Sequence, residues 1–391
     1  MPVSQVCHKF FSQSLNSLHK YRKNALLDMT VALTRGASLS LTSIGRYLPG
    51  PARVKHKIKR VDRHLNSELM FSDIPSACRQ LVSRLTRGLS LCVIAVDWSG
   101  YPSSELSVLR ASLLCDGRAI PLMSKVISSR FQNNSTVQNA FLDQMAAAIG
   151  RDKQVIIVTD AGFRSSWFHH IRSLGWHFVG RVRGSLYFQI TGDEEWQMAR
   201  DVVSVTKPCY LGFGRLARNA RRDCPGHFYT VHKRATGRKG SQRFPKTDRM
   251  YRKNAREPWL LFTSLVGYKP REIVKIYSRR MQIEQNFRDE KNERYGLGLR
   301  ASRSRGEKRI SVLCLVATLY SIIMWLTGYY LESRGINRWF QASSEKSRRV
   351  LSYLTLSENA IRQSPGILSG MNPDRIYADM ARAYRNIIMV Y

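Results

Sequence analysis

The chain has 391 residues, which is enough for two or three domains with hydrophobic cores of their own. Its 63 lysines and arginines outnumber its 28 aspartates and glutamates, so the formal net charge is +35, spread along the whole sequence. So much like charge opposes compaction, and it favours a nucleic-acid-binding protein over one without a polyanionic partner. The seven cysteines include no Cys-x-x-Cys pair, which indicates a reducing compartment and disfavours a disulfide-bonded secreted protein.

The first ninety or so residues predict helices separated by basic stretches. Residues 38–48, "SLSLTSIGRYL", begin in a Ser- and Thr-rich segment and end before Pro49-Gly50-Pro51, as a short helix would. A cluster of cations follows, formed by Arg53, Lys55, Lys57, Lys59, Arg60 and Arg63. On a helix these side chains would form a surface facing phosphates, the alternative being an ordinary solvated face.

From Leu91 the pattern changes to that of an α/β domain. Residues 91–97, "LCVIAVD", and 154–160, "QVIIVTD", are apolar runs typical of strands that are buried on both faces. Between them we expect an antiparallel hairpin and then a helix, and after them a helix and another strand. The fold class predicted is therefore α/β, with antiparallel elements on one side of the sheet.

Each of the two buried runs ends on an aspartate, Asp97 or Asp160. In open α/β sheets, ligands bind beyond the carboxyl ends of the strands, so both aspartates lie where a site is expected. The alternative is that each aspartate caps a turn, and this explanation is weaker for the pair than for either residue alone.

Residues 185–257 interrupt the α/β pattern with Gly, Arg and Lys between short strand-like pieces. We interpret them as a basic, strand-rich insertion, parts of which become ordered only on DNA. The sheet resumes at "WLLFTSL", residues 259–265, and a helix follows. The predicted regions are 1–88 (helical, DNA-binding), 89–184 (first part of the core), 185–257 (insertion), 258–300 (end of the core) and 301–391 (helical).

Residues 310–331 are 22 uncharged residues in a row, long enough to cross a membrane. This segment is the only one of its kind and contains Ser, Thr and Gly, so we expect a buried helix. The N-terminus has no basic region followed by an apolar run, so no secretory signal is evident. Cys209, Cys224, His227 and His232 match no common zinc-finger spacing, and we expect no zinc site there.

The segment "YSRRMQIEQNFRDEKN", residues 277–292, carries three carboxylates on what we predict to be one helix. At about 100° per residue, four side chains fall within about 60° of one another: Tyr277, Arg280, Glu284 and Lys291. Asp289 and Glu290 lie off this stripe, so Glu284 is the distinct carboxylate. An exposed ion pair between Arg280 and Glu284 is the alternative explanation.

Asp97, Asp160 and Glu284 could form one carboxylate cluster. Carboxylate oxygens suit hard cations such as Mg²⁺, and two ions about 3.5–4 Å apart can assist in-line attack on a phosphate. Arg280 and Lys291 would then hold substrate phosphates beside the metal ions.

Several motifs resemble bacterial cut-and-paste transposases of the insertion-sequence-four class. They are "VDWS", "VTDAGF" and the spacing Tyr277-x2-Arg280-x3-Glu284-x6-Lys291. "LPGPARVKHKIKRVDRHL", "LGWHFVGRVRG", "EPWLLFTSL" and "YSRRMQIEQNFRDEKNERYGLGLR" are especially similar to the group that includes the transposase of transposon ten. The likeness covers nearly the whole chain, and the Tyr-Arg-Glu-Lys signature is specific to this class.

The resemblance implies an RNase H-like catalytic core with a β-rich insertion, flanked by helical N-terminal and C-terminal regions. It implies a DDE triad at Asp97, Asp160 and Glu284, which binds Mg²⁺, or Mn²⁺ in its place, with two ions per active site. It further implies double-stranded DNA as partner, a homodimer in the DNA complex, no membrane, and a bacterial cytoplasmic, nucleoid-associated location.

Further residue roles follow from the same resemblance. Tyr277, Arg280 and Lys291 would hold the DNA of the transposon end, and Trp259 would stack on a displaced base during hairpin formation. A core aromatic at a strand edge is the alternative for Trp259. The implied reaction is hydrolysis, hairpin formation, hairpin opening and joining to target DNA. A metal-dependent nuclease or resolvase and a non-catalytic DNA-binding transposase remnant are the alternative functions.

Overall fold

The computed structural model describes residues 3–101, 105–217, 223–232, 257–342, 344–345 and 347–389. The chain divides into two compact units. Unit 1 consists of Met1–Lys153 and Met281–Tyr391, and unit 2 consists of Gln154–Arg280. Within the predicted basic insertion, residues 218–222 and 233–256 lie outside the described residues.

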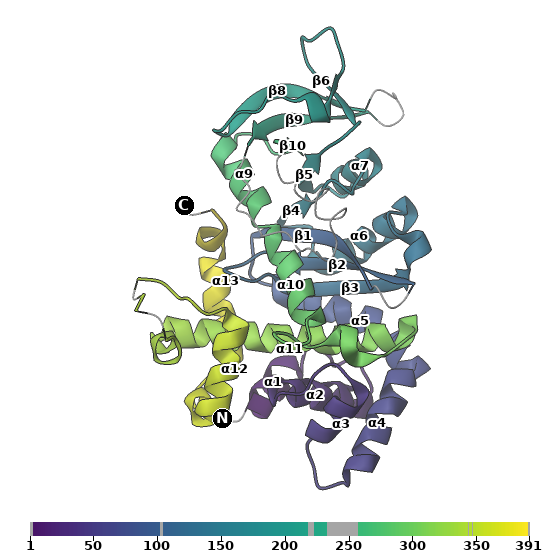
Figure 1. Ribbon diagram of the computed structural model, residues 1–391, viewed down its shortest axis with the longest axis vertical. Helices are drawn as coiled ribbons and strands as arrows, with labels where there is room; N and C mark the ends of the chain where they lie inside the picture. Colours follow the sequence, from purple (N-terminus) through teal and green to yellow (C-terminus); the bar gives the residue numbers. More distant parts are fainter. Residues whose placement is uncertain are drawn as a thin grey trace, which may run out of the picture. The chain divides into compact units, whose positions relative to one another are not determined.

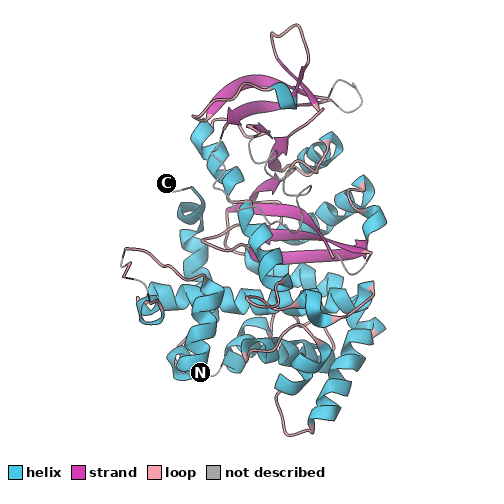
Figure 2. Ribbon diagram, viewed as in Figure 1, coloured by secondary structure: helices cyan, strands magenta, loops and turns pink. Residues whose placement is uncertain are grey.

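Unit 1 begins with five helices (Figures 1 and 2): α1 (Val3–Phe11), α2 (Lys20–Thr34), α3 (Leu41–Tyr47), α4 (Val54–Asn66) and α5 (Glu68–Thr86). The short helix predicted before Pro49 is confirmed as α3, and the Ser40 side chain caps it by accepting from the Ser43 amide. α3 and α4 pack closely, because a Cβ on Gly45 would lie only 2.7 Å from the Ile58 Cα atom. Glycine is therefore required at this crossing.

The predicted strand and hairpin of unit 1 are confirmed as β1 (Leu91–Gly100), β2 (Leu106–Leu113) and β3 (Ile120–Ser128), which pair antiparallel in the order β1-β2-β3. In this register Asp97 lies opposite Arg110. A short 3-10 turn, η1 (Ser129–Phe131), leads to the predicted helix, α6 (Ser135–Ile149), which is capped by the Asn134 side chain.

Helix α11 (Glu307–Ser333) forms the centre of unit 1 (Figure 1). It is long and apolar enough to cross a membrane, yet 89% of its most apolar window is buried inside the protein. It packs against β3, α2, α5, α12 and α13, which explains why it is apolar on all sides. The expectation of a buried helix is confirmed.

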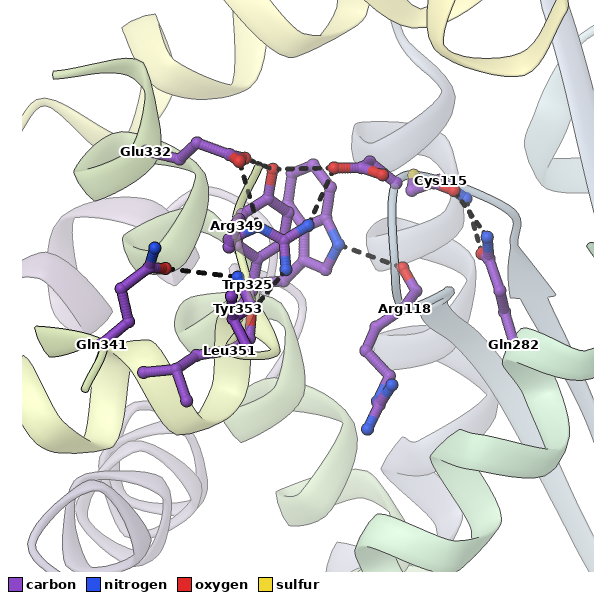
Figure 3. Close-up of polar contacts among 11 residues, drawn as sticks. Cys115, Arg118, Gln282, Trp325, Glu332, Gln341, Arg349, Leu351 and Tyr353 are labelled. Carbon is purple, nitrogen blue, oxygen red and sulfur yellow. Dashed lines mark hydrogen bonds and ion pairs between the residues drawn. The ribbon is translucent and has the colours of Figure 1, made fainter. Parts of the chain in front are cut away.

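The C-terminal part of unit 1 adds η3 (Leu299–Ser302), η4 (Ile336–Phe340), α12 (Tyr353–Gln363), η5 (Pro365–Leu368) and α13 (Pro373–Met389). This part is joined to the β2–β3 turn by the Arg349 guanidinium, which bonds the Asp116 and Glu332 carboxylates. Figure 3 shows Arg349 beside Glu332. The Trp325 indole N–H donates to the Arg118 carbonyl over 3.0 Å. The Arg349–Asp116 and Trp325–Arg118 bonds connect segments more than 200 residues apart in the sequence.

Unit 2 contains β4 (Gln154–Thr159), α7 (Ser165–Ser173), β5 (His177–Val182), β6 (Tyr187–Ile190), β7 (Gln197–Met198), η2 (Ala199–Asp201), β8 (Cys209–Leu216), β9 (Cys224–Val231), β10 (Trp259–Thr263) and α9 (Pro270–Ser278). Its strands lie in the order β4-β5-β10-β9-β8-β6-β7. β4 and β5 are parallel, whereas β10 is antiparallel to both β5 and β9. The sheet does resume at Trp259, as predicted.

The prediction of one helix over residues 277–292 is wrong. α9 ends at Ser278 and α10 (Met281–Lys291) begins three residues later, where unit 1 resumes. Between them the chain tightens into a turn in which the Arg280 amide donates to the Tyr277 carbonyl. Tyr277 and Arg280 therefore do not share a continuous helical stripe with Glu284 and Lys291. No glycine or proline marks the break, so the local sequence contains no signal of it.

Candidate active site

Asp97 lies within β1, which continues to Gly100 and remains paired with β2, so the expectation that this strand ends at Asp97 is wrong. The Asp97 Oδ1 atom accepts from the Trp98 amide over 2.8 Å. Arg110 stands opposite it on β2, so the two side chains share a face of the sheet. Ser99, two residues further along β1, shares that face as well. Arg110 and Ser99 both bond residues of α10, so this helix covers the face that carries Asp97.

Helix α10 is fixed to the β2–β3 hairpin by side chains of its buried face. The Gln282 amide bonds both the Cys115 amide, at 3.0 Å, and the Cys115 carbonyl, at 2.7 Å (Figure 3). Asn286, one turn further on, donates to the Ala119 carbonyl over 3.0 Å. Glutamine and asparagine bond to backbone here, so the hairpin itself sets the position of the helix.

The three carboxylates of α10 have different surroundings. Asp289 accepts from Arg118 over 2.7 Å, and Glu290 is buried in an ion pair with Arg110. Burial raises the pKa of Asp289, and the Arg118 hydrogen bond opposes that rise. Glu284 is the exposed one. It is thus the carboxylate of the three that is accessible to a substrate.

Asp160 follows β4 directly and belongs to unit 2. Its Oδ1 atom accepts from the Gly162 amide over 2.8 Å, so the aspartate caps the turn that follows the strand. The side chain is half-buried. Turn capping was the alternative explanation for this aspartate, and it accounts for one of the two carboxylate oxygens, Oδ1.

Asp97 and Glu284 belong to unit 1, and Asp160 belongs to unit 2. Within either unit taken alone, the described residues contain no group of three His, Cys, Asp or Glu side chains that could hold a metal ion. The donors that Asp97, Asp160 and Glu284 offer are carboxylate oxygens, the type of ligand that Mg²⁺ and Mn²⁺ prefer.

Trp259, Tyr277 and Arg280 form an aromatic and cationic cluster in unit 2. The rings of Trp259 and Tyr277 meet edge to face, with centroids 4.9 Å apart. The Arg280 guanidinium lies 5.9 Å from the Tyr277 ring centroid. Burial raises the pKa of the Tyr277 hydroxyl, the Arg280 and Arg181 charges oppose that rise, and the Asp160 charge adds to it.

Arg181 and Arg183 adjoin this cluster. Neither was predicted from the sequence to have a role. Arg181 lies opposite Leu261 in the β5–β10 register, on the sheet face that Trp259 shares by strand alternation. Burial lowers the pKa of Arg181, and Arg183 bonds the Glu257 carboxylate over 2.6 Å. The signal was present: the "RVR" stretch places two arginines on one face of a predicted strand.

Lys291 is buried, although the resemblance expects it to contact DNA. Its ammonium donates to the Ser99 hydroxyl and to the Gly100 carbonyl, each over 2.7 Å. It also lies 4.5 Å from the Tyr101 ring centroid. Burial lowers the pKa of Lys291 to about 8.

The mixed α/β fold, a large sheet with flanking helices, is consistent with the RNase H-like class of domains. The family model described as "Transposase DDE domain" matches residues 90–322, more than half of the chain. The chain therefore belongs to the DDE transposase family and acts on DNA. Transposases of this family generally use divalent metal ions. No curated protein matches the chain.

Proposed function

We propose that the protein is a cut-and-paste transposase of the insertion-sequence-four class, similar to the transposase of transposon ten. It binds the terminal inverted repeats of its element, excises the element by hydrolysis and a hairpin intermediate, and joins it to target DNA. The observation that carries the proposal is the exposed Glu284 on a helix that covers the Asp97 face of the sheet, inside a DDE transposase domain.

Asp97, Asp160 and Glu284 are the proposed catalytic carboxylates and the ligands of two Mg²⁺ ions, which Mn²⁺ can replace. Bound there, the ions would polarise a phosphoryl oxygen and activate water or a 3′ hydroxyl. The protein's own part is to orient these oxygens. Hydrogen bonds from the Trp98 and Gly162 amides hold one oxygen of Asp97 and one of Asp160, and so orient both carboxylates.

The cluster of Trp259, Tyr277 and Arg280 is the proposed grip on the transposon end. The Arg280 guanidinium suits phosphate oxygens, and the half-buried indole offers a surface for a displaced base. The Tyr277 ring is itself buried and packs against that indole. The resemblance adds Lys291 to this group. We further propose residues 1–88 as a DNA-binding region, a homodimer in the DNA complex, and a bacterial cytoplasmic, nucleoid-associated location.

The test uses purified protein, Mg²⁺ and linear DNA that carries the inverted repeats flanking the gene. We expect the wild type to make double-strand breaks at the repeat ends, with hairpinned intermediates. Glu284→Gln should lower the cleavage rate by roughly three orders of magnitude, the scale of metal-ion catalysis, while DNA affinity is kept. The matched control is Glu293→Gln, an exposed carboxylate just beyond α10, which should cleave normally.

Other results would contradict the proposal in distinct ways. Binding without cleavage in both Mg²⁺ and Mn²⁺ would indicate a DNA-binding remnant. Cleavage without joining would indicate a nuclease or resolvase. Cleavage that persists in Glu284→Gln would exclude Glu284 as a catalytic residue.

A further inference from the structure

The C-terminal turn of α10 is tied to β1 by a buried lysine. Lys291 is only 5% exposed. An ammonium has three N–H donors, and two are used by the Ser99 hydroxyl and the Gly100 carbonyl. The Phe287 ring, one turn earlier on α10, lies 5.4 Å from the same ammonium. The charge is thus held inside unit 1, between the end of β1 and its own helix.

Glu290, the residue before Lys291, is bonded to β2 through a buried ion pair with Arg110. Glu290 is 4% exposed and Arg110 is 1% exposed, and the guanidinium bonds Oε2 of the glutamate. The other oxygen, Oε1, accepts from the Tyr101 hydroxyl over 2.9 Å and from the Cys314 thiol over 3.4 Å. The Arg110 Nε atom donates to Ser124 on β3 over 2.8 Å. Both partners are hydrogen-bonded beyond the pair itself, as a buried ion pair needs in order to be tolerated.

These bonds bear directly on the proposed catalytic carboxylates. Arg110 is the cross-strand partner of Asp97, and Ser99 lies two residues along the same strand. Glu284 precedes Lys291 by seven residues, which places the two about 20° apart around α10 and about 10 Å apart along it. A shift of this helix against β1 would therefore change the separation of Glu284 and Asp97.

We propose that Lys291 is a positioning residue: together with the Arg110–Glu290 pair, it locks α10 to β1 and β2 and so sets where Glu284 stands relative to Asp97. This inference rests on the proposed catalytic roles of Glu284 and Asp97. It differs from the role that the resemblance gives to Lys291, because a lysine that bonds a DNA phosphate would have to leave Ser99 and Gly100.

Substitution of Ser99 distinguishes the positioning role of Lys291 from a role in binding a DNA phosphate. Ser99→Ala removes one bond to Lys291 but keeps the lysine and its charge, so a bond from the lysine to a phosphate would survive it. Ser107→Ala is the matched control. It also removes a hydroxyl from a hydrogen-bonded serine in this sheet, but Ser107 bonds Ser129 and Gln132, which lie outside α10.

The first measurement is amide hydrogen exchange of the full-length protein without DNA or metal, followed by mass spectrometry. We expect peptides covering residues 281–291 to exchange roughly tenfold faster in Ser99→Ala, the scale of removing a hydrogen bond to a charged group. Ser107→Ala should leave α10 unchanged. A second variant, Arg110→Met with Glu290→Leu, replaces both members of the ion pair, so that no charge is left buried and unpaired. It should also accelerate exchange in α10.

The second measurement is Mn²⁺ binding to the complex with repeat-end DNA, followed by electron paramagnetic resonance. We expect Ser99→Ala to raise the Kd for Mn²⁺ severalfold without changing DNA affinity. If Ser99→Ala matches Ser107→Ala in both measurements and Lys291→Met lowers only DNA affinity, the positioning role is wrong. A wild type that fails to cleave DNA would instead overturn the proposed function, while the exchange result would still decide whether Lys291 fixes α10.

Discussion

Lys291 keeps its charge at a cost to the folded state. Burial lowers its pKa from 10.5 to about 8, while the Glu290 charge opposes this change and the Arg300 and Arg110 charges add to it. Below about pH 8 the ammonium is protonated in both the folded and the unfolded chain, so the folded state bears the full free-energy cost of burying this charge. Between about pH 8 and 10.5 the unfolded chain binds more protons than the folded one, so stability contributed by this residue rises with pH.

We therefore predict that the free energy of unfolding of the wild type rises relative to that of Lys291→Met between pH 7 and pH 10, by up to roughly 3 kcal/mol, because the wild type sheds the buried charge. Lys291→Met should also lose activity. Thermal unfolding at both pH values measures this, with Lys20→Met, an exposed lysine, as control. A difference in Tm that is the same at pH 7 and pH 10 would contradict the prediction.

The candidate site could be predicted residue by residue only in part. Asp160 directly follows a strand as predicted, whereas β1 continues three residues beyond Asp97. Helical geometry separated Glu284 from Asp289 and Glu290. The catalytic roles of Asp97, Asp160 and Glu284 stay predictions. The burial of Lys291 could not be predicted, because its partners Ser99 and Gly100 lie more than 190 residues away in the sequence. Local periodicity carries no information about such long-range bonds.

Among the elements, α4 presents the most regular cationic surface of the N-terminal helices. Lys55, Lys59 and Arg63 are exposed and spaced four residues apart, so they form one stripe, while Val61 and Leu65 are buried on the opposite side. Two other members of the predicted cationic cluster bond within the protein: Arg60 bonds Asp28 at 3.1 Å, and Lys57 bonds the Leu48 carbonyl.

We predict that replacing Lys55, Lys59 and Arg63 with glutamine lowers the salt dependence of DNA binding. Each phosphate that the variant no longer neutralises should reduce the slope of log K against log salt by about 0.9, so the slope should fall by up to about 3. Fluorescence anisotropy between low and high salt measures this. The matched control replaces three exposed arginines of α13, Arg375, Arg382 and Arg385, and removes the same charge. Equal slopes in both triple variants would indicate a general charge effect and contradict a specific role for α4.

Element types were more predictable than their junctions. The buried runs before Asp97 and Asp160, the hairpin and the α3 helix all follow from pattern and capping. The break between α9 and α10 could not be predicted in this way. Arg279 and Arg280, which lie in the break, are good helix formers, so the turn between the two helices is set by tertiary structure. The residues on either side of that turn belong to different units, which sequence periodicity could not indicate.

At the scale of the whole molecule, unit 1 is assembled from both ends of the chain around α11. Helices α2, α4 and α5 from the N-terminal part and α12 and α13 from the C-terminal part pack on it, as does β3. A chain with a net charge of +35 needs a large apolar core to offset self-repulsion, and α11 provides much of it. Composition alone made this helix ambiguous, since a membrane span has the same length and hydropathy.

The burial of α11 leads to a prediction that a membrane span would not fulfil. Leu319 is fully buried at 0% exposure, so Leu319→Ala should leave a cavity in the centre of unit 1 and lower the free energy of unfolding by about 2–5 kcal/mol. Leu69→Ala, at a leucine that is 61% exposed, should have little effect. Thermal unfolding of the detergent-free protein compares the two. If α11 crossed a membrane instead, the wild type would require detergent, and the two alanine variants would not differ in this way. Because α11 contacts elements from both ends of the chain, the Leu319 cavity should also accelerate hydrogen exchange in α2 and α12 together.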